Sequence, residues 1–225
     1  MIIKVEKPKP GEIFYPSFQT GHSPVSMLLS LTAIGIMFYI GMKYLNDVDA
    51  IARAYANYSL FLAFIGFLGY IALDFIDDGR ITIIPKKYTT TDYVRMLVLA
   101  MAMFIIIAFI QFFLTVTLRL ALTMEDRILY FLFAAPCEEL FFRGLIVGGL
   151  TRMKVKWFIS VPISAVVFMI AHTATYIANP VMYASTLFCG FVLAAFYYRF
   201  RDIGANEFAH LFNNLRAVPN VLAVF

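Results

Sequence analysis

An apolar run from Ile128 to Leu150 is interrupted near its centre by Glu138, Glu139 and Arg143. The run is long enough to cross a bilayer as a helix, which takes about 20 apolar residues. A charge at the centre of such a helix costs at least about 2.5–3.5 kcal/mol on insertion scales. We therefore expect these charged residues to have a function and fixed partners inside the protein.

The spacing of the charged residues indicates which partners are available to them. Glu139 and Arg143 are four residues apart, so they share one helix face and can form an ion pair. Glu138 lies about 100° round the helix from Glu139 and has no cation at helical spacing. We therefore expect the partner of Glu138 to come from another helix.

The composition is that of an integral membrane protein. Of the 225 residues, 62% are hydrophobic and 14% are charged, whereas soluble proteins have roughly 45–50% and about 25%. The net charge of +4 is interpreted as Lys and Arg in cytoplasmic loops, and not as a nucleic-acid-binding surface. Cys137 and Cys189 both lie in apolar runs, where buried, unpaired thiols are expected.

Apolar segments separated by polar turns predict an all-α, polytopic helical membrane protein with about seven transmembrane helices and an intramembrane polar cavity. Residues 1–25 mix charges with prolines and are expected to form a surface segment, and residues 26–225 form the transmembrane domain. The expected spans are approximately Ser26–Leu45, Tyr58–Ile76, Val94–Leu118, Ile128–Leu150, Trp157–Ile177, Val181–Phe200 and Ile203–Phe225.

The loop charges predict the orientation of these spans. Cytoplasmic loops carry an excess of Lys and Arg. One side would carry Lys4, Lys7, Lys9, Arg80, Lys86, Lys87, Arg95, Arg152, Lys154, Lys156, Arg199 and Arg201. The other side would carry only Lys43, Arg53, Arg119 and Arg127. The sequence therefore predicts a multi-pass membrane protein whose N-terminus is cytoplasmic and whose C-terminus lies outside.

Polar residues also occur in two later spans. His172 lies four residues after Phe168 in the fifth span, and Asn214 lies four residues after His210 in the seventh. A histidine deep in an apolar helix needs a hydrogen-bonding partner. Two histidines and a Glu pair on three spans therefore predict one shared polar site, with motif residues between 132 and 215.

Such a site could perform hydrolysis in either of two ways. A Glu and a His can hold a water molecule and take its proton, while a second His and an Asn stabilise an oxyanion. Alternatively, Glu138, His172 and His210 could bind zinc, whose bound water is also a nucleophile. The chain has no His-Glu-x-x-His motif and no Gly-x-Ser-x-Gly motif.

Three motifs in order resemble a known family. Glu138-Glu139-x-x-x-Arg143, Phe168-x-x-x-His172 and His210-x-x-x-Asn214 resemble the motifs of the CAAX protease and bacteriocin-processing (CPBP or Abi) intramembrane proteases, which include the type II CAAX prenyl endopeptidases. The resemblance covers roughly Leu132 to Leu215. It implies a helical membrane protease with its site inside the membrane.

The resemblance also implies a role for each motif residue. Glu138 and His172 would activate the water, and His210 and Asn214 would stabilise the oxyanion. Glu139 and Arg143 would support them. The family has been described both as metal-dependent and as glutamate-dependent. We expect no metal here, because the ligands would be few and scattered, with zinc as the alternative.

We therefore expect an intramembrane endopeptidase that acts on a membrane-associated peptide or lipidated protein. We also expect it to contact membrane lipid and not to bind nucleic acid. A prenylated substrate is not assumed, since seven expected spans differ from the eight usual in the eukaryotic prenyl-processing branch. The alternative is a non-enzymatic scaffold or immunity protein that retains the motifs. A proton-coupled transporter is disfavoured because the sequence has no inverted repeat.

Overall fold

The computed structural model describes residues 24–43, 61–62, 64–66, 68, 89–114, 134–173 and 179–217. Within these residues every regular element is helical, which confirms the predicted all-α class for this part of the chain. The elements are α1 (Pro24–Lys43), α3 (Thr90–Phe113), η1 (Leu140–Val147), α5 (Gly148–Arg152), α6 (Trp157–Ala171), α8 (Pro180–Phe200) and α9 (Ile203–Ala217). The predicted surface segment at residues 1–25 lies almost wholly outside the described residues.

The helices occur where the apolar runs predict them, although several boundaries differ. α6 ends at Ala171 and not near Ile177, and His172 is its C-terminal cap residue. In the described part of the chain, α3 and α8 are the two helices long and apolar enough to cross a membrane, and α6 is a shorter apolar helix. Seven spans and their orientation remain predictions.

The starts of α3 and α8 are set by capping side chains. The Thr89 backbone N–H donates to Asp92 Oδ2 at 2.9 Å, and the Asp92 N–H donates back to Thr89 Oγ1 at 3.3 Å. This reciprocal pair satisfies two N–H groups that have no partner within the helix. At α8, Asn179 Oδ1 accepts from the Met182 N–H at 3.2 Å, and Pro180 occupies the first helical position.

α9 follows α8 after two residues, because the chain turns sharply at Arg201. Arg201 has a left-handed backbone conformation with φ of 55°. Asp202 then accepts a hydrogen bond at Oδ1 from the Ala205 N–H at 3.0 Å, which caps the start of α9. Burial raises the pKa of the Asp202 carboxyl above its usual value, because removal from water disfavours the charged form.

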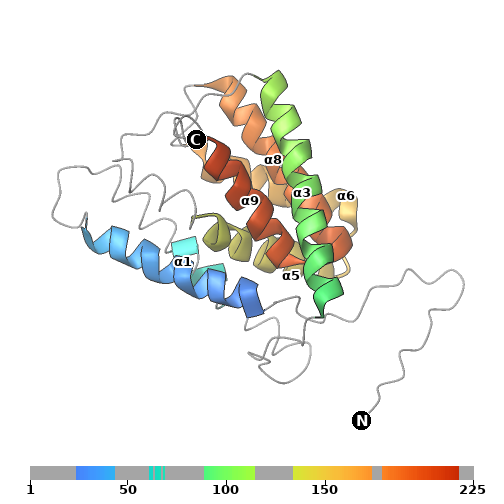
Figure 1. The fold of residues 1–225 in the computed structure, drawn as a ribbon. Coiled ribbons are helices and arrows are strands. Elements are labelled where there is room, and N and C mark those ends of the chain that lie inside the picture. The colour runs from blue at the N-terminus through green and yellow to red at the C-terminus, as the bar shows by residue number, and fades with distance from the viewer. Residues whose placement is uncertain are drawn as a thin grey trace, which may run out of the picture.

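α3, α8 and α9 lie side by side (Figure 1), and their contacts form the largest described core. Its buried residues are Met96, Ala100, Met103, Ile107, Cys189, Leu193, Ala205 and Ala209. α6 packs against α8, and η1 contacts α6, α8 and α9. The segment with the Glu–Glu–Arg motif is therefore enclosed by the helices that carry the two histidines.

The outer face of α3 is strongly apolar. Its exposed large residues include Val94, Leu97, Val98, Met101, Ile105, Phe109, Phe112 and Phe113. Contiguous apolar surface of this kind is rare on soluble monomers and marks contact with a membrane or a partner.

The helical residues 61–62, 64–66 and 68 approach the backbone of η1 at Gly66. A Cβ at position 66 would lie 2.7 Å from the Phe141 backbone nitrogen and 2.9 Å from the Leu140 carbonyl carbon. Leu62, from the same short segment, packs with Phe142 and Phe168. Only glycine therefore fits between the two backbones at this point.

We expect Gly66→Ala to lower the free energy of unfolding by about 1–3 kcal/mol, because the added methyl group forces two backbones apart. Gly35→Ala in α1 is the matched control, since a Cβ there would meet nothing within 4 Å. The control should be neutral or slightly stabilising, because alanine favours a helix over glycine by about 1 kcal/mol. Denaturation of both variants in detergent micelles tests this, and equal midpoints would contradict the close approach.

Candidate active site

The Glu–Glu–Arg motif spans a change of helix type. Residues 134–139 are α-helical, and the chain continues directly into the π-helix η1. The Ser164 hydroxyl of α6 donates to the Phe142 carbonyl oxygen of η1 at 2.9 Å, and Ser164 is fully buried. Short π-helical segments are often found at functional sites. The apolar pattern of the sequence contains no signal for this change.

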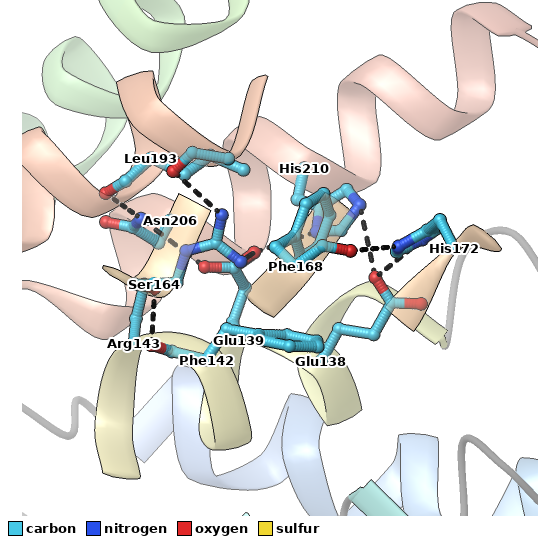
Figure 2. Close-up of polar contacts among 11 residues, drawn as sticks. Glu138, Glu139, Phe142, Arg143, Ser164, Phe168, His172, Leu193, Asn206 and His210 are labelled. Carbon is cyan, nitrogen blue, oxygen red and sulfur yellow. Dashed lines mark hydrogen bonds and ion pairs between the residues drawn. The ribbon is translucent and has the colours of Figure 1, made fainter. Parts of the chain in front are cut away.

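Glu139 and Arg143 form the ion pair that their spacing predicts. Arg143 NH1 lies 3.0 Å from Glu139 Oε1, and both side chains are completely buried. Arg143 NH2 also donates to the Gly190 carbonyl oxygen of α8 at 3.3 Å, and the guanidinium carbon lies 4.5 Å from the Phe168 ring centroid (Figure 2). The arginine is thus held by an anion, a carbonyl group and an aromatic face.

Gly190 makes this arrangement possible. A Cβ at position 190 would lie 3.1 Å from Phe168 Cδ1 and 3.2 Å from the Ala165 Cα. The absence of a side chain therefore lets α8 approach α6 closely. This approach brings the Gly190 carbonyl within reach of Arg143.

Glu139 also holds the seventh-span histidine. His210 Nδ1 lies 2.8 Å from Glu139 Oε1, and Asn206 Nδ2 donates to Glu139 Oε2 at 3.4 Å (Figure 2). Asn206 donates as well to the Leu193 carbonyl at 2.8 Å. Sequence reasoning missed Asn206, although an asparagine four residues before His210 on the same helix face was an available signal.

Glu138 finds its partners on other helices, as predicted. Its Oε2 atom lies 3.7 Å from His172 Nε2 and 3.7 Å from His210 Nε2. These distances are longer than a direct hydrogen bond of about 2.7–3.2 Å. The carboxylate therefore lies close to both rings, just beyond direct hydrogen-bonding distance.

The tautomer of each histidine follows from the partner of its Nδ1 atom. His172 Nδ1 lies 2.7 Å from the Phe168 carbonyl oxygen, which can only accept, so Nδ1 carries the proton. In the same way, His210 Nδ1 donates to the Glu139 carboxylate. Both Nε2 atoms therefore face Glu138 (Figure 2).

The chemical types of these three side chains suit zinc, since catalytic zinc sites use His and Glu with a further position for water. The partners of the two Nδ1 atoms also resemble the outer contacts of metal-binding histidines. However, within the described residues no three His, Cys, Asp or Glu side chains are grouped so as to hold a metal ion. The expectation of a metal-free site stays a prediction.

Asn214 lies one helical turn beyond His210 on α9 and is half-buried. The structure thus brings Glu138, Glu139, Arg143, His172 and His210 into one cluster. Asn214 follows this cluster along α9. Its role in stabilising an oxyanion, like the role of each other motif residue, remains a prediction.

Glu207 is a second residue to which the sequence assigned no part in the site. Its carboxylate is fully buried and accepts a hydrogen bond at Oε1 from the Ser30 hydroxyl of α1 at 2.8 Å. This contact joins α1 to the helix that carries His210. A buried carboxylate needs a hydrogen-bond donor, but the sequence alone does not identify which residue supplies it.

The fold and the site define a class of protein. It is a helical bundle with an apolar exterior and a buried Glu–Arg–His cluster. Residues 123–216 match the model of the family described as type II CAAX prenyl endopeptidase Rce1-like. The matched segment contains all three motifs, and the match confirms the resemblance to the CAAX protease family. No curated protein and no solved structure matches the chain.

Proposed function

We propose that this protein is an intramembrane endopeptidase that hydrolyses a peptide bond of a membrane-associated or lipidated substrate. The observation that carries the proposal is the convergence of Glu138 Oε2 with the Nε2 atoms of His172 and His210, each 3.7 Å away. The match to a protease family over the same residues supports it. We place the protein in the membrane as a multi-pass protein with a cytoplasmic N-terminus.

The reaction begins with a water molecule held between Glu138 and His172. Glu138 takes a proton from this water, and the water oxygen forms a bond with the carbonyl carbon of the substrate. The resulting tetrahedral intermediate then breaks its C–N bond. The proton on Glu138 passes to the leaving amine nitrogen, which restores the carboxylate.

The negative charge on the substrate oxygen needs donors in the low-dielectric interior. His210, when protonated at Nε2, and the Asn214 amide would supply them. Glu139 fixes the ring of His210 through Nδ1, and Arg143 balances the charge of Glu139. In this scheme Glu139, Arg143 and Asn206 are positioning residues and do not touch the substrate.

A zinc ion is the alternative that the sequence left open as the source of the nucleophile. Glu138, His172 and His210 would be its ligands and it would supply a bound water that ionises near neutral pH, but these side chains are not grouped for metal binding in the described structure. In either case the outer contacts of the histidines orient the two rings as described above.

Cleavage of a labelled peptide library by the purified protein in detergent tests the proposal. Half of the library should carry farnesylated C-termini, and each assay should be repeated with a strong zinc chelator. We expect cleavage that survives the chelator. If cleavage occurs without the chelator and is lost when the chelator is added, the enzyme depends on a metal ion. Failure of a stably folded protein to cleave any member would count against the enzyme and favour the non-enzymatic scaffold.

A further inference from the structure

The π-helical segment η1 follows the Glu pair without a break. Glu139 immediately precedes η1 and has ordinary α-helical backbone angles, with φ of −64° and ψ of −38°. A π-helix is rare and usually lasts a single turn, whereas η1 runs for eight residues. Neighbouring parts of the protein must therefore hold η1 in this form.

α6 holds η1 at Phe142. The Ser164 hydroxyl donates to the Phe142 carbonyl oxygen at 2.9 Å, and both residues are 0% exposed. The ring of Phe168, one turn further along α6, packs edge-on against the Phe142 ring with the two centroids 5.0 Å apart. The backbone and the side chain of Phe142 are thus both fixed by the same helix (Figure 2).

The same helix carries His172. Ser164, Phe168 and His172 follow one another at intervals of four residues, so they lie along one side of α6. Phe142 lies about one helical turn after Glu138. The Ser164 hydrogen bond and the 3.7 Å approach of His172 to Glu138 therefore join the same two helical segments at two points. A shift of η1 against α6 at the first point would change the distance at the second.

We infer that Ser164 is a positioning residue, whose hydroxyl holds η1 against α6 and so sets the distance between Glu138 and His172. Because Ser164 is 0% exposed, it acts through Glu138 and not on the substrate. The effect on catalysis rests on the proposed function, whereas the position of the Glu pair can be measured without any activity.

Ser164→Ala tests the inference by kinetics. The substitution removes the hydroxyl that donates to the Phe142 carbonyl oxygen. We expect kcat for peptide cleavage to fall by about 10-fold to 100-fold, because a misplacement of about 1 Å in a catalytic arrangement can cost about 100-fold in rate. KM should change little, since the lost contact is not made with the substrate.

Ser160→Ala is the matched control. Ser160 is also 0% exposed and lies one turn earlier on α6, but its hydroxyl donates to the carbonyl oxygens of Val155 and Lys156 at 3.2 and 3.3 Å. Its loss should leave kcat unchanged. If Ser164→Ala does not fold, Ser164→Cys takes its place, because a thiol is a weaker hydrogen-bond donor. Equal kcat values for the folded Ser164 variant and for Ser160→Ala would overturn the inference.

A second measurement reports the position of the Glu pair without any cleavage. The chain has three histidines, so ¹⁵N labelling of histidine gives a simple NMR spectrum. His210 lies on α9 and contacts Glu139, so its ring resonances report movement of the pair. We expect these resonances to shift in Ser164→Ala and not in Ser160→Ala.

Unchanged His210 resonances in a folded Ser164→Ala protein would mean that the hydroxyl does not position the Glu pair. Shifted resonances, together with an unsubstituted protein that cleaves nothing, would leave the positioning role intact and count against the endopeptidase itself.

Discussion

Glu138→Gln is expected to reduce peptide cleavage by about 100-fold to 10⁴-fold, the range that a positioned general base contributes. The amide has nearly the same size as the carboxylate and can still contact both histidines. It cannot accept a proton from water, so the nucleophile is not generated. Initial rates of peptide cleavage by the purified variant, measured beside its melting temperature, provide the test.

Glu207→Gln is the matched control for this variant. It makes the same substitution at another fully buried carboxylate on the helix that carries His210. A glutamine oxygen at position 207 can still accept the Ser30 hydroxyl, so cleavage should remain within a few-fold of the original rate. Wild-type cleavage by a folded Glu138→Gln protein would refute the catalytic role of Glu138, whereas equal losses in both variants would indicate a structural effect.

Arg143→Met is expected to lower the free energy of unfolding by about 3–5 kcal/mol, the cost of leaving one member of a buried ion pair without its partner. Methionine fills part of the volume but leaves the Glu139 carboxylate without its cation. Arg199→Met is the control, because Arg199 is exposed at the end of α8. That change should stay within about 0.5 kcal/mol. Reversible unfolding in mixed micelles measures both.

A double-mutant cycle separates the ion pair from simple packing. Glu139→Gln combined with Arg143→Met should be less destabilised than the sum of the two single variants, because the pair removes both buried charges together. Additive effects would mean that the 3.0 Å contact between Glu139 and Arg143 carries no coupling energy. The same cycle should affect cleavage, because Glu139 also orients His210.

Local patterns account for much of the fold. Apolar runs predicted the helices, and the spacing of four residues predicted the Glu139–Arg143 pair, because helical periodicity is a property of neighbouring residues. The same reasoning showed that Glu138 required a partner from another helix. Charged groups within an apolar run are costly enough to indicate a site before any contact is known.

The contacts between helices could not be predicted in this way. Nothing in the periodicity of α9 indicates that Asn206 reaches Glu139 or that Glu207 meets Ser30, 177 residues away. Nor does it indicate that η1 adopts a π-helix against Ser164. Such contacts depend on how closely helices approach, and here that approach depends on small residues such as Gly190.

The amino-acid order alone thus specifies the helices, the chemical identity of the site residues and the internal Glu–Arg pair, since these follow from spacings within one helix. Only the tertiary structure decides that both histidines turn Nε2 toward Glu138, because each ring is oriented by an Nδ1 contact that folding creates.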